Sequence, residues 1–426
     1  MKDRIIERGP GFVPSLRDLP KHIGPTAIGY GTTAWLFAVT GPFLIMLNAA
    51  KQGNLSVAQI DSWIFGVYFF GGLLTLILAL YYRQPVPAAT SIPGAVLVGT
   101  ALTHLSFPEV IGAYILTGVF ITLLGVSGIV RRGMEWLPTP IMMAMVAGVL
   151  LPFGVGIMNS FTQSPSLSLV TFLAFIAVSL VVPVAKRFPP VLGAIVVGLI
   201  AATAMGQANW QSLPFEIARP IVFTPTFTLP AAVELVVPLA LTVVAIQNAQ
   251  GIGILLSTGY KPPINSFTIA SGIGSVIMGV FGGQSACIAG PMTGIISSPS
   301  VGKQEGRYAA AIVTGSLWMI FGIFSPVTTS VARILPSSLI NLLAGLALLS
   351  VLVGCFNAAF SGKFRLGALF TFIITISGVT LFNIGAPFWG LVGGAAISAL
   401  LEPGDFQEIT KKRVGAVDAA AELQNA

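Results

Sequence analysis

The sequence predicts an all-α polytopic membrane protein with fourteen transmembrane segments, arranged as a 7+7 inverted repeat. Three observations lead to this fold class. Hydrophobic residues make up 55% of the 426 residues and charged residues only 8%, whereas soluble domains carry roughly 25% charged residues. Apolar stretches of about 20 residues, the length that spans a bilayer, follow one another along the chain. Two of these stretches are interrupted in the same way.

Polar and charged segments separate fourteen candidate spans. They lie near residues 26–50, 58–81, 84–104, 108–130, 137–158, 166–185, 189–207, 230–257, 264–282, 284–300, 307–329, 337–358, 364–382 and 385–401. The third and tenth spans are broken, because each begins as an irregular piece, meets a Pro/Gly break and continues as a short apolar helix. The breaks are at Pro93 and Gly94, and at Gly290 and Pro291. We expect both to be a short strand followed by a half-helix.

The positions of lysine and arginine test this count and orient the chain. With a cytoplasmic N-terminus, 18 of the 21 basic residues fall on the cytoplasmic side, and only Lys51, Arg219 and Arg333 fall outside. This asymmetry follows the positive-inside rule. Omitting either broken span would invert every later loop and remove the asymmetry. We therefore expect an inner (plasma) membrane protein with both termini in the cytoplasm.

The linker 208–229 is the longest polar stretch between spans and divides the chain near its middle. The expected parts are a cytoplasmic tail 1–25, a first repeat 26–207, an extracytoplasmic linker 208–229, a second repeat 230–401 and a cytoplasmic tail 402–426. Because seven is odd, a duplicated seven-span unit must be inverted relative to its partner. Two glycine pairs, Gly71 with Gly72 and Gly282 with Gly283, precede the broken spans and are taken as matching positions.

Inversion turns the two half-helices toward each other near the bilayer midplane. Their free N–H groups and the positive ends of their dipoles favour a small anion, above all a carboxylate. The residues expected to form this seat lie at the breaks, and are Thr90, Ser91, Gly94, Ser285, Gly290 and Thr293. The alternative interpretation is that the breaks are kinks within packed helices.

The eighth span carries the most polar residues at membrane depth. Gln247 and Asn248, followed by Gly251, offer donors and acceptors without a charge, and intramembrane polar groups mark functional sites by default. The same amides can instead hold the helix bundle together. Further candidates, one polar and two able to stack on a planar ring, are Tyr30, Phe43 and Phe281.

Carboxylates inside the spans are scarce. Glu234 lies about one turn into the eighth span, where it either relays protons or is solvated at the mouth of a long helix. The chain has no metal-binding cluster, nucleophile–base pair or phosphate-binding loop motif. The sequence therefore argues against an enzyme, a cofactor, a bound metal and an ATP-driven pump, and the placement of the basic residues points to membrane topology rather than nucleic acid.

Several motifs together resemble the benzoate membrane transport (BenE-type) family. They are the amide block from Gln247 to Ile252, the GYKPP turn from Gly259 to Pro263, the FGG from Phe281 to Gly283, the SIPGA segment from Ser91 to Ala95, and the ending NIGAPFWGLVGG from Asn383 to Gly394. The similarity covers roughly residues 26–401.

The resemblance implies a secondary active transporter that imports benzoate or a related aromatic carboxylate with protons, on the fold shared with nucleobase and sulfate-type transporters. It implies a core domain, 26–130 and 230–329, that moves like an elevator against a gate domain, 137–207 and 337–401, through which a homodimer can form. Nucleobase relatives commonly have a glutamate where this chain has Gln247, and a carboxylate there would repel an anionic substrate. The alternatives are a nucleobase or inorganic-anion transporter on the same fold, or a channel or non-transporting membrane protein.

Overall fold

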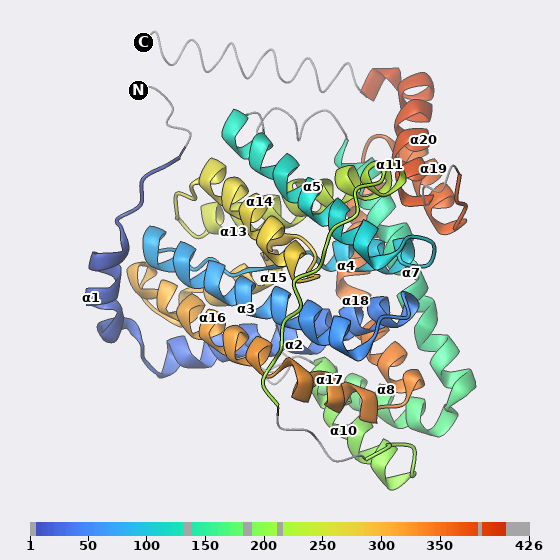
Figure 1. Ribbon diagram of the computed structural model, residues 1–426, viewed down its shortest axis with the longest axis horizontal. Coiled ribbons are helices and arrows are strands. Elements are labelled where there is room, and N and C mark those ends of the chain that lie inside the picture. Colours follow the sequence, from blue (N-terminus) through green and yellow to red (C-terminus); the bar gives the residue numbers. More distant parts are fainter. Residues whose placement is uncertain are drawn as a thin grey trace. The chain divides into compact units, whose positions relative to one another are not determined.

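A computed structural model describes residues 6–128, 130, 138–181, 190–210, 216–381 and 386–405. The chain divides into two compact units (Figure 1), one formed by Met1–Met134 with Pro152–Leu349 and the other by Glu135–Leu151 with Ser350–Ala426. Most described residues are helical, as the sequence predicts.

The first unit contains most of the helices and both strands. Before the central linker they are α1 (Phe12–His22), α2 (Pro25–Gln52), α3 (Val57–Tyr82), β1 (Ala88–Thr90), α4 (Ile92–Ala101), α5 (Phe107–Ser127), the end of α7 (Thr139–Gln163), α8 (Pro165–Leu180) and α10 (Pro190–Ala204). After it comes an uninterrupted helix, 229–257, made of α11 (Leu229–Ala231), the π-helical turn η1 (Ala232–Val236), α12 (Val237–Leu241), the π-helical turn η2 (Thr242–Asn248) and α13 (Ala249–Ser257). The unit continues with α14 (Ile264–Val280), β2 (Ala286–Ile288), α15 (Gly290–Ile296), the 3₁₀ turns η3 (Pro299–Val301) and η4 (Gln304–Gly306), α16 (Tyr308–Ile323), α17 (Ser325–Ile334) and the start of α18 (Ser337–Phe360).

The second unit, described by itself, pairs α19 (Arg365–Ile376) with α20 (Ala386–Leu401). Glu402 caps α19, because its carboxylate accepts the backbone N–H groups of Leu366 (2.8 Å) and Gly367 (2.9 Å). Burial alone would raise the pKa of Glu402, but these bonds and one from the hydroxyl of Ser398 lower it.

Among the described residues, six helices are long and apolar enough to cross a membrane, or seven if a bent pair at 337–360 counts as one span. The remaining apolar helices have 10–17 residues, so the count of fourteen crossings stays a prediction. One expected span, 307–329, is divided in the structure, because α16 ends at Ile323 and α17 begins at Ser325. Pro326 lies in the first turn of α17, where a proline is favoured but cannot continue the preceding helix.

Both broken segments have the expected form, a three-residue strand followed by a short helix. The two strands pair with each other in antiparallel register, with Ala89 opposite Cys287. Each strand is also held by a hydroxyl from the helix before it. Thr75 of α3 accepts the N–H of Ala88 at 2.8 Å, and Ser275 of α14 accepts the N–H of Ala286 at 2.9 Å.

Two helix crossings involve the helices that precede the strands, and each brings two glycines together. In Figure 1, α3 runs beside α16 and α14 runs beside α5. Gly72 and Gly315 meet at the first crossing, where a side chain on either glycine would collide with the carbonyl oxygen of the other. Gly118 and Gly272 meet at the second, and a Cβ on either would come within 2.7 Å of the other's carbonyl oxygen.

These contacts correct the glycine match expected from the sequence. Gly72 lies inside α3, whereas Gly282 and Gly283 come after the end of α14, with Gly282 in a left-handed turn (φ 83°). The position in α14 that, like Gly72, meets a glycine of its crossing helix is Gly272. It lies three residues before Ser275, just as Gly72 lies three residues before Thr75. The Gly-Gly dipeptide does not mark equivalent positions, because glycine is common wherever helices cross closely.

Two extended segments bind opposite ends of these helices. At one end, the segment that leads into α1 places the carboxylate of Glu7 on the N-terminus of α14, where it accepts the N–H groups of Asn265 (3.0 Å) and Ser266 (2.9 Å). At the other end, the linker 216–228 crosses the helix ends (Figure 1). Its backbone N–H groups bond the helices as follows: Ala218 to Ile323, Ile221 to Ser62, Phe223 to Val280 and Thr226 to Pro108.

Candidate substrate site

The paired strands bring three of the expected seat residues together. Ser285 offers its carbonyl oxygen to the N–H of Ser91 and to the hydroxyl of Thr90, both at 3.4 Å. Ser91 in turn caps α4, because its Oγ accepts the N–H of Gly94 at 3.2 Å. Ser285, Thr90, Ser91 and the capped Gly94 are all buried. The helix of the third span therefore begins next to Ser91, as the sequence predicts, and the structure places this start beside the paired strands.

The two amides of the eighth span have different surroundings. Asn248 accepts the N–H of Ile288 in β2 at 2.7 Å and donates to the hydroxyl of Ser271 at 3.1 Å. Gln247 is buried beside it, and its Oε1 has no hydrogen-bond partner among the described residues. Asn248 thus ties helix 229–257 to β2, while Gln247 keeps an unused acceptor or, if the amide is turned, an unused donor.

Side chains packed directly on the backbone explain the glycines around α15. A Cβ on Gly251 would come within 2.6 Å of the Ile288 side chain, and one on Gly290 would collide with the side chain of Gln250. Thr293, one turn into α15, bonds the carbonyl oxygen of Ala289 at 2.8 Å. Gln250, the third amide of the 247–250 run, therefore lies at the N-terminus of α15 and joins the candidate residues.

A small enclosed cavity adjoins the strand crossing. It is lined by Ala38, Pro42, Val67, Tyr68, Ala89, Thr90, Met292 and Trp318, none of which carries a charge. Its free space of about 10 Å³ admits no more than a water molecule, whereas benzene needs a cavity of about 150 Å³. Of the residues expected from the sequence, Thr90 lines this cavity.

Several buried polar atoms around the strands have no partner among the described residues. They include Trp318 Nε1 on the cavity wall, Ser285 Oγ, and Gln284 Nε2, whose side-chain oxygen accepts the indole N–H of Trp63. An unpaired buried polar group costs about 1–3 kcal/mol. Trp318 Nε1 and Gln284 Nε2 are hydrogen-bond donors, and the hydroxyl of Ser285 can also donate.

The three remaining candidates lie apart from the cavity wall. Phe43 packs behind it, with its ring 6.5 Å from that of Tyr68. Phe281 packs its ring on Phe70 of α3 at 5.0 Å. Tyr30 precedes the lining residue Ala38 by eight positions on α2, about 12 Å along a helix axis.

Sequence reasoning missed the aromatic residues of the cavity. Tyr68 and Trp318 are buried at 4% and 1% exposure, and the Tyr68 hydroxyl donates to the carbonyl oxygen of Ala38 at 2.8 Å. Neither stands in a motif. The signal that points to Trp318 is its place in α16, three residues after the crossing glycine Gly315.

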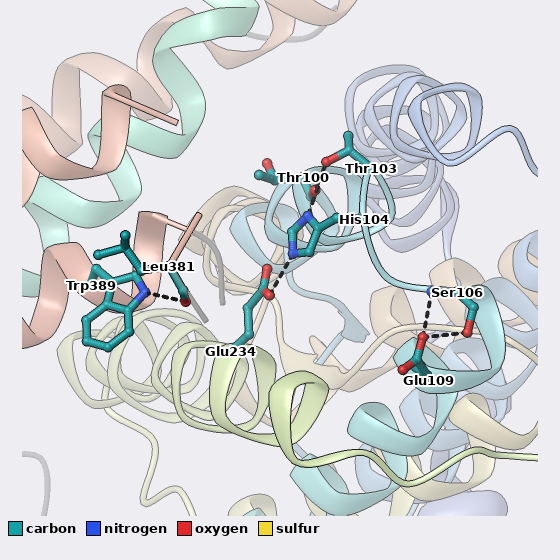
Figure 2. Close-up of polar contacts among 8 residues, drawn as sticks. All are labelled: Thr100, Thr103, His104, Ser106, Glu109, Glu234, Leu381 and Trp389. Carbon is teal, nitrogen blue, oxygen red and sulfur yellow. Dashed lines mark hydrogen bonds and ion pairs between the residues drawn. The ribbon is translucent and has the colours of Figure 1, made fainter. Parts of the chain in front are cut away.

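Glu234 is buried rather than solvated. Only 4% of the residue is exposed, and its Oε2 lies 2.9 Å from Nε2 of His104 in the turn after α4 (Figure 2). The Nδ1 of His104 lies 3.3 Å from the hydroxyl of Thr103. The N-terminal part of helix 229–257 is covered because α4 and α5 pack against η1.

Comparison with known proteins identifies the chain's relatives. The family model described as "Benzoate membrane transport protein" (BenE) matches residues 21–400. The chain belongs to the benzoate membrane transport family. Its relatives include inner membrane protein YdcO of Escherichia coli strain K12, which is 33% identical over 381 residues, covering 89% of this chain and 96% of that protein. The benzoate membrane transport protein of Acinetobacter baylyi is 29% identical over 398 residues, covering 91% and 98%.

Solved structures of low sequence identity share the fold of this family member. The transmembrane domain of the cyanobacterial bicarbonate transporter BicA aligns with a TM-score of 0.60 at 15% identity, covering 92% of this chain and all of that domain. The murine Slc26a9 anion transporter in its inward-facing state aligns with a TM-score of 0.60 at 16% identity, covering 92% and 71%. The chain is therefore a membrane transporter and not an enzyme, which confirms the resemblance read from its motifs.

Proposed function

We propose that this transporter imports benzoate or a related aromatic carboxylate together with protons. The observation that carries the proposal is a cavity walled by Tyr68 and Trp318 next to unpaired buried donors, in a chain of the benzoate membrane transport family. Aromatic rings pack favourably against a planar ring. The donors Trp318 Nε1 and Ser285 Oγ suit a carboxylate, which has acceptor atoms only. Gln247 adds a neutral polar group that does not repel an anion.

The inverted repeat forms part of the proposal. Three equivalences between the halves support it. Thr75 and Ser275 each accept a strand N–H, and Gly72 and Gly272 each lie at a helix crossing. The two strands pair with each other about a local two-fold axis. The segment bearing Glu7 and the linker 216–228 bind opposite ends of the same helices. This supports a cytoplasmic N-terminus and an external linker; the fourteen crossings of the inner membrane are part of the same proposal.

Transport by alternating access completes the proposal. The cavity holds about 10 Å³, so binding of an aromatic acid requires movement of its walls. In the proposed elevator step the core domain, 26–130 and 230–329, moves the substrate against the gate domain, 137–207 and 337–401, and the gate domain forms the interface of a homodimer.

Ligand-dependent stability tests the substrate class. A ligand that binds only the folded state raises the unfolding temperature with concentration. Purified protein in mild detergent should be stabilised by benzoate more than by uracil, sulfate or bicarbonate. The proposal fails if no aromatic acid stabilises the protein, and preference for uracil or an inorganic anion would assign one of the alternative substrate classes.

Two variants test the site. Trp318→Phe keeps a ring but removes the unpaired N–H, and Gln247→Ala removes the amide whose oxygen has no partner among the described residues. Both should weaken benzoate stabilisation about tenfold or more in concentration, since a hydrogen bond to a charged group contributes about 1.5–3 kcal/mol. Trp210→Phe and Gln163→Ala are matched controls at exposed positions. Unchanged benzoate affinity in Trp318→Phe would move the carboxylate away from this cavity.

A further inference from the structure

The His104–Glu234 pair joins the far ends of the two elements that carry the candidate seat. α4 begins just after its cap Ser91, beside the paired strands, and leads to His104. Helix 229–257 carries Glu234 and, 13 positions later, Gln247. The elements also pack between these points, because a Cβ on Gly94 would meet the Leu239 side chain at 3.2 Å. A change at the pair therefore acts on both walls of the seat.

One hydrogen-bond arrangement around His104 places an added proton on the pair. The Thr103 hydroxyl has one hydrogen, which it donates to the carbonyl oxygen of Thr100 at 2.7 Å. Its oxygen is then left to accept a hydrogen from Nδ1 of His104. With Nδ1 protonated, the 2.9 Å contact between Nε2 and Glu234 needs a second hydrogen, either on the imidazole or on the carboxyl group. Without it, two lone pairs would face each other in a buried place.

The described elements packed against the pair bring few other titratable groups to it. The elements packed against η1 in this unit are α4, α5, α11 and α12, and only α5 carries titratable side chains, Glu109 and Tyr114. Glu109 is engaged at the start of α5, where it accepts the N–H and the hydroxyl of Ser106 (Figure 2). Tyr114 is buried on the same helix.

We propose that His104 and Glu234 form the proton-binding site that couples proton movement to substrate movement. Solvent reaches the pair through His104, whose side chain is 18% exposed, while the Glu234 side chain is 4% exposed. The proton enters on the imidazole and is shared with the Glu234 carboxylate. Its loss leaves a buried carboxylate without a compensating proton, a costly arrangement, so release separates the end of α4 from helix 229–257. A π-helical turn at Glu234 fits this role, since such turns occur often at functional sites.

Transport measurements test the pair, and this part rests on the proposed function. Proteoliposomes should exchange benzoate at equal pH and, for one proton per substrate, accumulate it up to about tenfold per pH unit, above the leak measured in protein-free liposomes. Glu234→Gln and His104→Gln should lose gradient-driven accumulation, and exchange at equal pH in the same vesicles distinguishes lost coupling from lost transport. Glu216→Gln, in the exposed linker, should behave as wild type. Accumulation by Glu234→Gln at the wild-type level would overturn the proposal, as would parallel loss of exchange and benzoate stabilisation.

A measurement without substrate separates the two proposals. If wild type shows neither benzoate exchange nor stabilisation, the proposed function fails, and the proton site is judged by unfolding temperature against pH. Because one proton is shared, Glu234→Gln, His104→Gln and the double variant should lose the same pH-dependent component. Effects that add in the double variant, or profiles parallel to wild type, would overturn the pair as a proton site.

Discussion

Removing the hydroxyls that hold the two strands tests the matched architecture directly. Thr75→Val preserves the shape of a buried side chain but leaves the N–H of Ala88 without its acceptor. Ser275→Ala does the same to the N–H of Ala286. Both hydroxyls also donate to a carbonyl oxygen one turn earlier in their own helix. Losing this bond should matter little, because a helical carbonyl oxygen also accepts a backbone N–H.

The expected loss follows from the orphaned donor. A buried N–H without a partner costs about 1–3 kcal/mol, and both serine and threonine here are fully buried. We therefore expect each variant to lower the free energy of unfolding by about 2 kcal/mol, within about 1 kcal/mol of each other. The double variant should depart from additivity, because β1 and β2 pair with each other.

Unfolding in mixed micelles, followed by tryptophan fluorescence, measures these losses. Thr33→Val is the control, since its hydroxyl bonds the carbonyl oxygen of Gly29 on an accessible face of α2. Wild-type stability in both variants would refute the hydrogen-bond reasoning. If only one variant lowered the free energy of unfolding, the hydrogen bond would still explain that loss. The equivalence of the two halves would be refuted.

Three further predictions concern packing, capping and pH. Gly72→Ala and Gly272→Ala should each destabilise by about 1–3 kcal/mol in the same assay, because their Cβ atoms would meet backbone at the crossings; a neutral effect of either would contradict close approach. Glu7→Gln should cost about 1 kcal/mol and speed tryptic cleavage at Arg8, and unchanged cleavage would contradict the α14 cap. The lowered pKa of Glu402 makes its stabilisation of the α19 N-terminus complete above about pH 4.5 and progressively lost below it. The amide-exchange protection factors at the start of α19 should therefore fall on acidification in wild type but not in Glu402→Gln.

Local signals were enough to predict the parts of the site that depend on chain order. The Pro/Gly breaks at Pro93 and Pro291 determine where helices start, since proline is favoured in a first helical turn, and α4 and α15 begin within two residues of them. The amides 247–248 were found because polar groups stand out in an apolar span. These features need no knowledge of which helices become neighbours.

Features that depend on helix crossings could not be predicted in this way. Trp318 and Tyr68 meet at the cavity because α16 crosses α3 at paired glycines, and the chain has 28 phenylalanines, 6 tryptophans and 7 tyrosines with no pattern to separate them. His104 and Glu234 are 130 positions apart. Position within a span suggested a solvated Glu234, but burial is decided by α4 and α5, which cover that turn.

The distribution of satisfied and unsatisfied polar groups supports the proposed substrate site. Non-helical backbone inside a membrane protein is stable only where its N–H and carbonyl groups find partners. Here the N–H groups of Ala88, Ala286 and Ile288 are each accepted by a side chain from a neighbouring helix. The unpaired atoms nearby belong to side chains instead, Trp318 and Ser285 among them. Because the backbone is already stabilised, binding an acceptor-rich ligand gains hydrogen bonds at these side chains without breaking those that hold the strands.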